Sequence, residues 1–386
     1  MQKNLINECR VTFSIKTEGP ILIKKQINKD RLIPADLEYL KKVFGLSDVE
    51  KLSDSYFVRT SKDGRLVPYI PGSSMKGVIR SHCERICKTL MKNSSCNPFQ
   101  NIKSNLKDTH ITDDFSCTGR LQILKEYSKQ GELPSKPYTL SCPVCKLFGN
   151  GFLQSRTLLP DGYGAHYNNP NQQIIGTTRT VYLPRRDGVG IDRYSGGAVS
   201  GVKFDFEVEE NAVFLFQDII IKNFDLWQLG LLAYIFQDFE DKLIKIGFGK
   251  SRGLGNVSGM VEQMQIVYYG NSQKPDTNKF HGIAKSPDNI DYYTQKEQDY
   301  FSGYGAEIAL DFEKPLVSAG YRHYYSFPKE EAKKVLSTVS DTFSNSDNRG
   351  YLNGAGYEIP EEMRISYIKE LVKKYEKEET TEAQNG

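Results

Sequence analysis

Four cysteines in one polar stretch are the residues best suited to chemistry. Cys142 and Cys145 form a C-x-x-C pair that contains Pro143, and Cys96 and Cys117 precede them. Four thiolates can close a tetrahedral zinc site, and the metal would stabilise a segment that has few apolar residues. A redox-active C-x-x-C is the competing interpretation, but no thioredoxin-like βαβ pattern surrounds the pair. We therefore predict a structural Zn²⁺ bound by Cys96, Cys117, Cys142 and Cys145.

Other residues could replace one of these ligands, because the spacings from Cys96 to Cys117 and on to Cys142 are longer than in a standard zinc finger. The alternative ligands are His82, Cys83, Cys87 and His110. Buried helix thiols are the simpler interpretation of Cys83 and Cys87.

The glycine-rich loop 247–255, Gly-Phe-Gly-Lys-Ser-Arg-Gly-Leu-Gly, is a second candidate. Its four glycines can reach backbone angles that other residues avoid and let another backbone come close. Lys250 and Arg252 add positive charge beside bare amides, which suits a phosphate-bearing ligand. The spacing fits neither a Walker A loop, which would need glycine in place of Ile244, nor a dinucleotide fingerprint. A structural turn between two elements is the alternative.

The start of a predicted helix is a third candidate. Residues 70–74 read Ile-Pro-Gly-Ser-Ser, a turn followed by helical spacing from Met75 onward. Lys76 and Arg80 lie one turn apart near the helix N-terminus, where bare amides favour an anion. An ordinary capped helix with two solvated cations is the alternative.

Residues 150–200 are rich in Gly, Asn and Arg and predict an extended hairpin. Its Asp192-Arg193-Tyr194 stretch follows Arg179 and two further arginines. Such a hairpin can wedge between nucleotides and grip their backbone. A flexible surface hairpin with solvated arginines is the alternative.

The elements that must position these residues alternate along the chain. Period-two patterns predict strands over 8–15, 202–221 and 256–269, and Asp225 is expected to cap an apolar helix that runs to about Ile244. Together with the helix from Met75, this order is compatible with a ferredoxin-like, split βαβ core. The predicted fold class is α+β.

We expect a core over residues 1–269 with two insertions, a zinc-binding one (93–150) and the hairpin (150–200). Polar residues 270–305 are expected to form a linker. Residues 306–386 are expected to form a C-terminal α+β extension, with a strand over 306–312 and helices over 328–342 and 360–378.

The composition limits the possible partners. The chain has 386 residues and a net charge of +3, so a nucleic-acid role requires cations concentrated on one surface. It has no apolar run of membrane-spanning length and no signal-peptide pattern, so we expect a cytoplasmic protein with no membrane partner. Seven cysteines without an export signal argue against disulfides.

Four motifs occur here in one order: Ile70 to Gly77, Cys142 to Gly149, Ile191 to Ala198 and Gly249 to Gly255. Together they resemble the RAMP superfamily, and specifically the backbone subunit of type III CRISPR effector complexes, nearest to the III-D-like branch. The resemblance covers about residues 8–268 and leaves 270–386 outside.

The resemblance implies an RRM-like core and a filament of copies of the chain, with other CRISPR effector subunits, along a guide crRNA that is presented to target RNA. Asp192 to Ala198 would form a thumb hairpin that kinks the guide–target duplex at intervals. The implied RNA-binding residues are Ser73, Ser74, Lys76, Arg80, Arg179, Asp192, Arg193, Tyr194, Gly249, Lys250, Ser251, Arg252 and Gly253.

Many such subunits also cut the target RNA once per subunit. The family's catalytic aspartate lies shortly before the Pro-Gly-Ser-Ser turn, where Asp54 is the nearest candidate, with Asp30, Asp36 and Asp63 behind it. A carboxylate there could hold Mg²⁺ or assist attack by the target's 2′-hydroxyl. The loop is longer here than in the family pattern, and some relatives leave cutting to an accessory nuclease. Whether this chain is an enzyme stays open.

Two other functions stay open as well. One is a stand-alone RAMP endoribonuclease that processes precursor crRNA, for which His82 on the first helix would be the catalytic candidate. The other is a zinc-stabilised interaction protein that binds no RNA.

Overall fold

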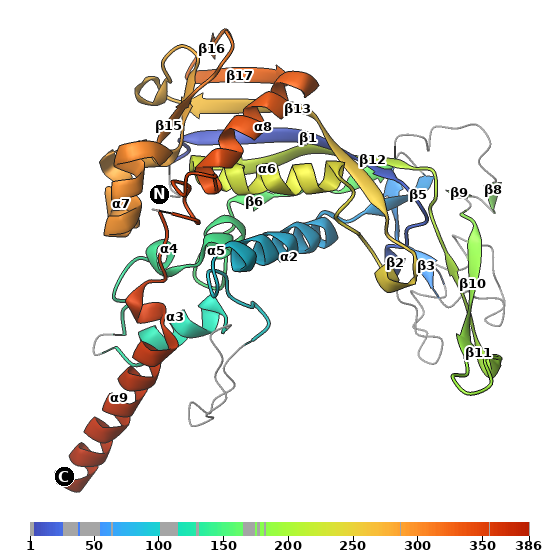
Figure 1. The fold of residues 1–386 in the computed structure, drawn as a ribbon, viewed down its shortest axis with the longest axis horizontal. Coiled ribbons are helices and arrows are strands. Elements are labelled where there is room, and N and C mark those ends of the chain that lie inside the picture. Colours follow the sequence, from blue (N-terminus) through green and yellow to red (C-terminus); the bar gives the residue numbers. More distant parts are fainter. Residues whose placement is uncertain are drawn as a thin grey trace.

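The chain is built on one large sheet, flanked by helices and by a long hairpin (Figure 1). The computed structural model describes residues 4–25, 38, 55–62, 65–100, 115–128, 131–164, 174–175, 178–180, 183–285, 287–354 and 356–385. The strands of the large sheet are β1 (Asn7–Thr17), β4 (Arg59–Lys62), β5 (Arg65–Ile70), β6 (Thr157–Leu158), β7 (Gly162–Gly164), β8 (Ile174–Ile175), β9 (Thr178–Thr180), β12 (Val213–Lys222), β13 (Val257–Tyr269), β16 (Val317–Ala319) and β17 (Arg322–Pro328).

The strand order is β16-β17-β13-β1-β12-β7-β5-β9-β8, with β4 on β5 and β6 on β12. The pairs are antiparallel except for β5 with β9. Three two-stranded sheets pair β2 (Lys24–Lys25) with β3 (Tyr56–Phe57), β10 (Arg185–Ile191) with β11 (Ala198–Glu207), and β14 (Lys279–His281) with β15 (Glu307–Ala309). The helices are α2 (Gly72–Leu90), α3 (Cys117–Glu126), α4 (Pro137–Leu140), α5 (Pro143–Phe148), α6 (Leu226–Glu240), α7 (Gln295–Tyr300), α8 (Lys329–Phe343) and α9 (Ile365–Asn385). The predicted α+β class is confirmed.

The core lies between β1, β13 and helix α6. Alternate residues of β1 are buried, as its period of two predicts, and Phe13 packs against Phe236 and Phe239 of α6 with ring centroids 5.1 and 5.4 Å apart. Asp225 caps α6 through a reciprocal capping box with Gln228. The helix ends at Glu240, earlier than Ile244, because the chain turns at Lys242 with a φ of 61°.

Residues 270–386 join this core. β17 pairs along β13, and α8 lies beside α6 (Figure 1). The stretch 270–305, which we expected to be a linker, contains β14 and α7 and buries Tyr293, Tyr300 and Phe301. The stretch is polar overall, but its aromatic side chains supply enough apolar surface to pack against the core. The predicted strand over 306–312 corresponds to β15, and the two predicted helices correspond to α8 and α9.

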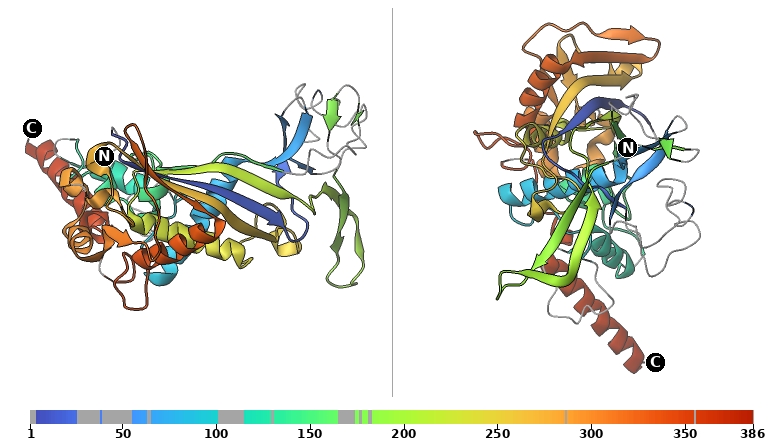
Figure 2. Two further views of the ribbon diagram at one scale, coloured as in Figure 1. Left: turned by 90° about the horizontal axis from the view of Figure 1, so that it is seen from above. Right: turned by 90° about the vertical axis from the view of Figure 1, so that its right-hand side faces the viewer.

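Two elements project from opposite ends of the molecule (Figure 2). The hairpin β10–β11 extends beyond the sheet at one end, and helix α9 extends away from the body at the other. Among the described residues, no helix is long and apolar enough to cross a membrane.

Candidate metal centre and nucleic-acid interface

The four cysteines predicted as metal ligands come together. The Sγ atoms of Cys96, Cys117, Cys142 and Cys145 all lie within 4.8 Å of one another, and all four residues are buried. Sγ of Cys96 lies 3.6 Å from that of Cys145 and 3.9 Å from that of Cys142. Zn–S bonds of about 2.3 Å place tetrahedral ligands about 3.8 Å apart. The cluster could therefore bind a metal such as zinc.

Short helices bring these thiols together. Ser116 caps α3 by accepting a hydrogen bond from the Gly119 N–H, so that Cys117 begins the helix. Pro143 starts α5, and the first turn of this helix carries Cys145 back toward Cys142 at the N-cap. Hydrogen bonds from Cys117, Cys145 and Cys96 hold the pKa of the Cys142 thiol well below its usual range. The thiolate is the form that ligates a metal.

Arg80 and Lys76 of α2 reach the segment that carries the cysteines. Arg80 donates from Nη2 to Sγ of Cys145 (3.4 Å) and from Nη1 to the carbonyl oxygen of Gly149 (3.2 Å). Lys76 donates from Nζ to Oγ of Ser155 at 2.8 Å. The two cations expected at the guide phosphates thus hold the cysteine-bearing segment against α2. An N–H···S bond of this kind also stabilises a metal-bound thiolate.

Ser73 and Ser74 are exposed at the start of α2. Neither caps the helix, because the N-cap position is Pro71 and the backbone N–H of Gly72 donates to Oδ1 of Asp161 (2.8 Å). A side chain at Gly72 would meet the carbonyl oxygen of Leu159 at 2.2 Å. The turn therefore requires glycine for close packing, and its two serines stay available to a ligand.

All four glycines of the loop 247–255 have left-handed backbone angles, with φ between 73° and 91°. A Cβ at Gly247 or Gly255 would come within 2.4 Å of a carbonyl oxygen, from Leu22 and Ile246 respectively. The Phe248 N–H donates to the Leu22 carbonyl at 2.8 Å, which fixes the loop on the segment after β1. Between these anchors, Lys250–Arg252 form one exposed 3₁₀ turn. The glycines thus shape a rigid loop that presents two cations.

Cations from three parts of the chain gather at this loop. Nζ of Lys24 lies 4.9 Å from the ring centroid of the partly exposed Phe248, and the Arg252 guanidinium lies 5.6 Å from the same centroid. Burial lowers the pKa of Lys250, and the positive charge of Arg85 on α2 lowers it further. Among the described residues, no carboxylate lies within ion-pair distance of Lys24, Arg85, Lys250 or Arg252.

We call Lys24, Arg85, Phe248, Lys250 and Arg252 the loop cation cluster. Cations held together without a carboxylate favour binding of an anion. Sequence reasoning identified Lys250 and Arg252 but missed Lys24, Arg85 and Phe248. Phe248 could have been identified from the sequence, because it is the one aromatic residue of the loop. Lys24 and Arg85 reach the loop through long-range contacts that no local pattern reveals.

The hairpin β10–β11 ends in a tight turn held by Asp192. Its Oδ1 accepts from the Tyr194 N–H (3.1 Å) and its Oδ2 from the Ser195 hydroxyl (2.7 Å). These hydrogen bonds lower the pKa of Asp192. Arg193 and Tyr194 are exposed at the tip, and Tyr194 is completely so. Asp192 therefore shapes the tip, and the residues that follow it are free to contact a ligand.

At the hairpin base, the Arg252 guanidinium lies 5.9 Å from the ring centroid of Phe204.

His82, the catalytic candidate of the stand-alone nuclease hypothesis, is buried between two helices. Its Nε2 lies 2.6 Å from Oδ2 of Asp238 on α6, and its Nδ1 lies 2.7 Å from Nη2 of Arg85. Both ring nitrogens therefore have protein partners. His82 lies outside the cysteine cluster, as do Cys83 and Cys87.

Several predicted residues lie outside the part of the chain that the structure describes. Asp54 is one of them, as are Asp30, Asp36, Asp63 and His110. The backbone of Arg179 lies in β9, but its side chain is outside the description.

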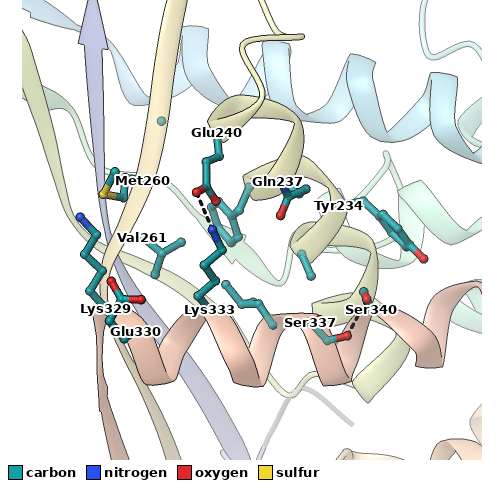
Figure 3. A pocket seen from close by; sticks show the side chains of 14 residues that line it. Tyr234, Gln237, Glu240, Met260, Val261, Lys329, Glu330, Lys333, Ser337 and Ser340 are labelled. Atoms are coloured by element: carbon teal, nitrogen blue, oxygen red, sulfur yellow. Dashed lines mark hydrogen bonds and ion pairs between the residues drawn. The ribbon is translucent and has the colours of Figure 1, made fainter.

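A separate hollow of about 230 Å³ lies between α6, α8 and β13 (Figure 3). Its lining includes the apolar residues Phe236, Val261 and Leu336. Nζ of Lys333 pairs with Oε1 of Glu240 at 2.6 Å beside it. The lining as a whole contains two lysines and two glutamates, so the hollow lacks the excess positive charge of the loop cation cluster.

A comparison with known protein families matches the part of the sequence that contains most of these features. A family model described as the RAMP superfamily matches residues 14–258, more than half of the 386 residues. The matched range begins within β1, ends within β13 and includes the cysteine cluster, the hairpin and the glycine-rich loop. No curated protein matches the sequence significantly.

Proposed function

The chain belongs to the RAMP superfamily, and on this premise we propose that it is a backbone subunit of a CRISPR effector complex, holding a guide crRNA. Membership itself indicates a CRISPR-associated, RNA-binding role. The observation that carries the finer assignment is the loop cation cluster, in which four cations gather beside a rigid glycine-rich loop without a carboxylate partner among the described residues. A polyphosphate backbone supplies the missing negative charge at regular spacing.

In this proposal Lys250, Ser251 and Arg252 contact guide phosphates, with Gly249 and Gly253 allowing the backbone to approach. Ser73 and Ser74 contact the guide at the start of α2. Phosphate contacts fix position and carry no sequence information, so base pairing with the guide would select the target RNA. Lys76 and Arg80 hold the cysteine-bearing segment against α2, through the hydrogen bonds to Ser155 and Cys145.

The topology supports a ferredoxin-like core. The central strands lie in the order β13-β1-β12-β7, and α2 and α6 follow the first strand and β12 along the chain. A split βαβ core has this arrangement of four strands and two helices. We propose residues 1–269 as that core, with residues 93–150 as a zinc-binding insertion and the hairpin of 150–200 as its thumb, where Tyr194 and Arg193 would contact the duplex.

The remaining parts of the proposal concern assembly and cutting. Copies of the chain would line up along one guide, together with other effector subunits. Asp54 would act in target cleavage with a divalent metal such as Mg²⁺, or an accessory nuclease would cut instead. The projecting α9 and the rest of residues 306–386 would contact a neighbouring subunit.

The two alternatives are less well supported. A stand-alone nuclease would need a histidine that is accessible to RNA, whereas His82 is buried with Asp238 and Arg85 on its two nitrogens. An interaction protein without RNA does not account for the RNA-binding role that family membership indicates.

Binding of a labelled single-stranded RNA, measured over a range of salt concentrations, tests the proposal. The Lys250→Ala, Arg252→Ala double variant should reduce the slope of log K against log salt by about 1.4, since each lost phosphate contact on a single strand removes about 0.7. Lys92→Ala is the matched control, because Lys92 is an exposed lysine just after the end of α2. A wild-type protein that binds no RNA would contradict the proposal.

A further inference from the structure

A chain of three side chains links α6 to the loop cation cluster. Asp238 on α6 contacts Nε2 of His82 at 2.6 Å, and Nδ1 of His82 contacts Nη2 of Arg85 at 2.7 Å. Arg85 carries only donors, so Nδ1 must accept from it, and the proton of the neutral imidazole then lies on Nε2 and points at Asp238. The carboxylate thus fixes the tautomer that can hold Arg85.

The two ends of this chain differ in exposure. His82 is buried, whereas Arg85 is exposed and belongs to the loop cation cluster. Arg85 has no carboxylate within ion-pair distance among the described residues, although its neighbour on the same helix, Arg80, pairs with Glu84 at 3.1 Å. An exposed arginine normally loses rotamer freedom when it binds a ligand. Here the hydrogen bond to His82 already restricts the rotamers of Arg85 before a ligand binds, so less rotamer freedom is lost on binding.

We propose that Arg85 binds a phosphate of the RNA backbone, and that His82, held by Asp238, is a positioning residue for Arg85. The observed geometry of Asp238, His82 and Arg85 fixes the guanidinium on the surface of α2. A phosphodiester there would accept charge-assisted hydrogen bonds from the guanidinium. The inference rests on the proposed RNA-binding function and gives His82 a role that requires no cleavage.

The proposal makes a distinctive prediction for a double-mutant cycle. Arg85→Ala should lower the salt slope of binding to an oligouridylate RNA by about 0.7, the contribution of one phosphate contact on a single strand. His82→Ala should lower the affinity in the wild-type background because Arg85 loses its support. In the Arg85→Ala background, His82→Ala should change neither affinity nor slope, because its effect passes through Arg85.

Two further variants test whether His82 acts by positioning Arg85 or only by stabilising the fold. Asp238→Asn keeps an oxygen that accepts from Nε2–H, so RNA affinity should stay near that of wild type. Asp238→Ala should lower the affinity as His82→Ala does. The melting temperature of each variant is measured alongside, and Lys92→Ala is again the control for loss of an exposed cation near α2.

The outcomes distinguish this inference from the proposed function. A reduced slope for Arg85→Ala, with no added effect of His82→Ala in that background, supports the site. An unchanged slope for Arg85→Ala, in a protein whose slope does fall with Lys250→Ala, overturns the site but leaves the RNA-binding proposal standing. Equal losses from His82→Ala in both backgrounds overturn the positioning role. A wild-type protein that binds no oligouridylate overturns both.

Discussion

Trp227 and Tyr351 stack face to face, with ring centroids 4.0 Å apart and an interplanar angle of 5°. Trp227 is the only tryptophan and lies at the start of α6, whereas Tyr351 lies in the C-terminal part of the chain. The Tyr351 hydroxyl also donates to Oε1 of Glu297 at 2.6 Å, and Glu297 forms a buried ion pair with Lys146 of α5. One cluster thus joins the core, the cysteine-bearing segment and the C-terminal part.

Tyr351→Ala should therefore destabilise the whole chain, by about 3–5 kcal/mol, the cost of truncating a large buried aromatic residue. Trp227 fluorescence should report the loss of stacking in the native state. Unfolding followed by fluorescence and by circular dichroism should give one shared transition in the wild type, since the extension and the core share this cluster. Tyr194→Ala, which truncates a fully exposed tyrosine, is the control and should change stability by less than about 0.5 kcal/mol. Two separate transitions in the wild type would show that the extension folds by itself.

The cysteine cluster predicts one bound zinc ion per chain. Cys142→Ser should abolish it and lower the melting temperature, because metal binding to four buried thiolates stabilises the folded state. Cys9→Ala is the control, since Cys9 is buried in β1 and is not one of the four clustered thiols. Elemental analysis of protein purified without added metal decides the point, and wild-type protein without zinc would argue against the site.

Asp225 predicts a specific pH dependence of stability. Burial raises its pKa from 3.8 to about 6. Because the folded-state value lies above the unfolded one, this group's contribution is fully present below pH 3.8 and is lost as the pH rises through about 6. The shift corresponds to about 3 kcal/mol. Asp225→Asn removes the titration and keeps a capping oxygen.

The unfolding free energy of Asp225→Asn should therefore rise relative to wild type by up to about 3 kcal/mol between pH 4 and pH 7. Urea unfolding of both proteins at several pH values measures this difference. Any effect of pH on zinc binding is common to the two proteins and cancels. Parallel curves over this range would mean that Asp225 does not titrate as described.

Asp54→Asn tests the proposed cleavage. In a reconstituted complex with Mg²⁺, the variant should lose cutting of a matched target RNA and keep the wild-type affinity for the guide. Equal cleavage by both proteins would assign catalysis to another residue, with Asp30, Asp36 and Asp63 as the next variants. A wild-type complex that never cuts matched RNA would instead favour an accessory nuclease.

Local patterns predicted the parts of the fold that depend on local periodicity. The alternation of Cys9, Val11, Phe13 and Ile15 identified β1, and Asp225 before an apolar helix identified the start of α6. The C-x-x-C pair identified half of the cysteine cluster, and the polar composition around it suggested a metal as the stabilising agent. Each of these signals lies within a few residues of the feature that it predicts.

Features formed by distant contacts were not predictable in this way. Arg80 and Lys76 look like solvated cations on a helix, but they reach Cys145 and Ser155 because the cysteine-bearing segment folds back onto α2. Residues 270–305 read as polar, yet four of their aromatic side chains, Phe280, Tyr293, Tyr300 and Phe301, fill the core. Lys24 and Arg85 join the glycine-rich loop only when strand β2 and helix α2 are in place.

The central claim is that the chain holds a guide RNA, and the most direct measurement is the RNA that it carries. The chain is co-expressed with a repeat–spacer array and its neighbouring gene products, purified without nuclease treatment, and the bound nucleic acid is sequenced. The account predicts a high 260/280 absorbance ratio, RNA that begins or ends in repeat sequence, and much less of it with the Lys250→Ala, Arg252→Ala variant. Wild-type protein that elutes free of RNA and stays monomeric when guide is added would contradict it.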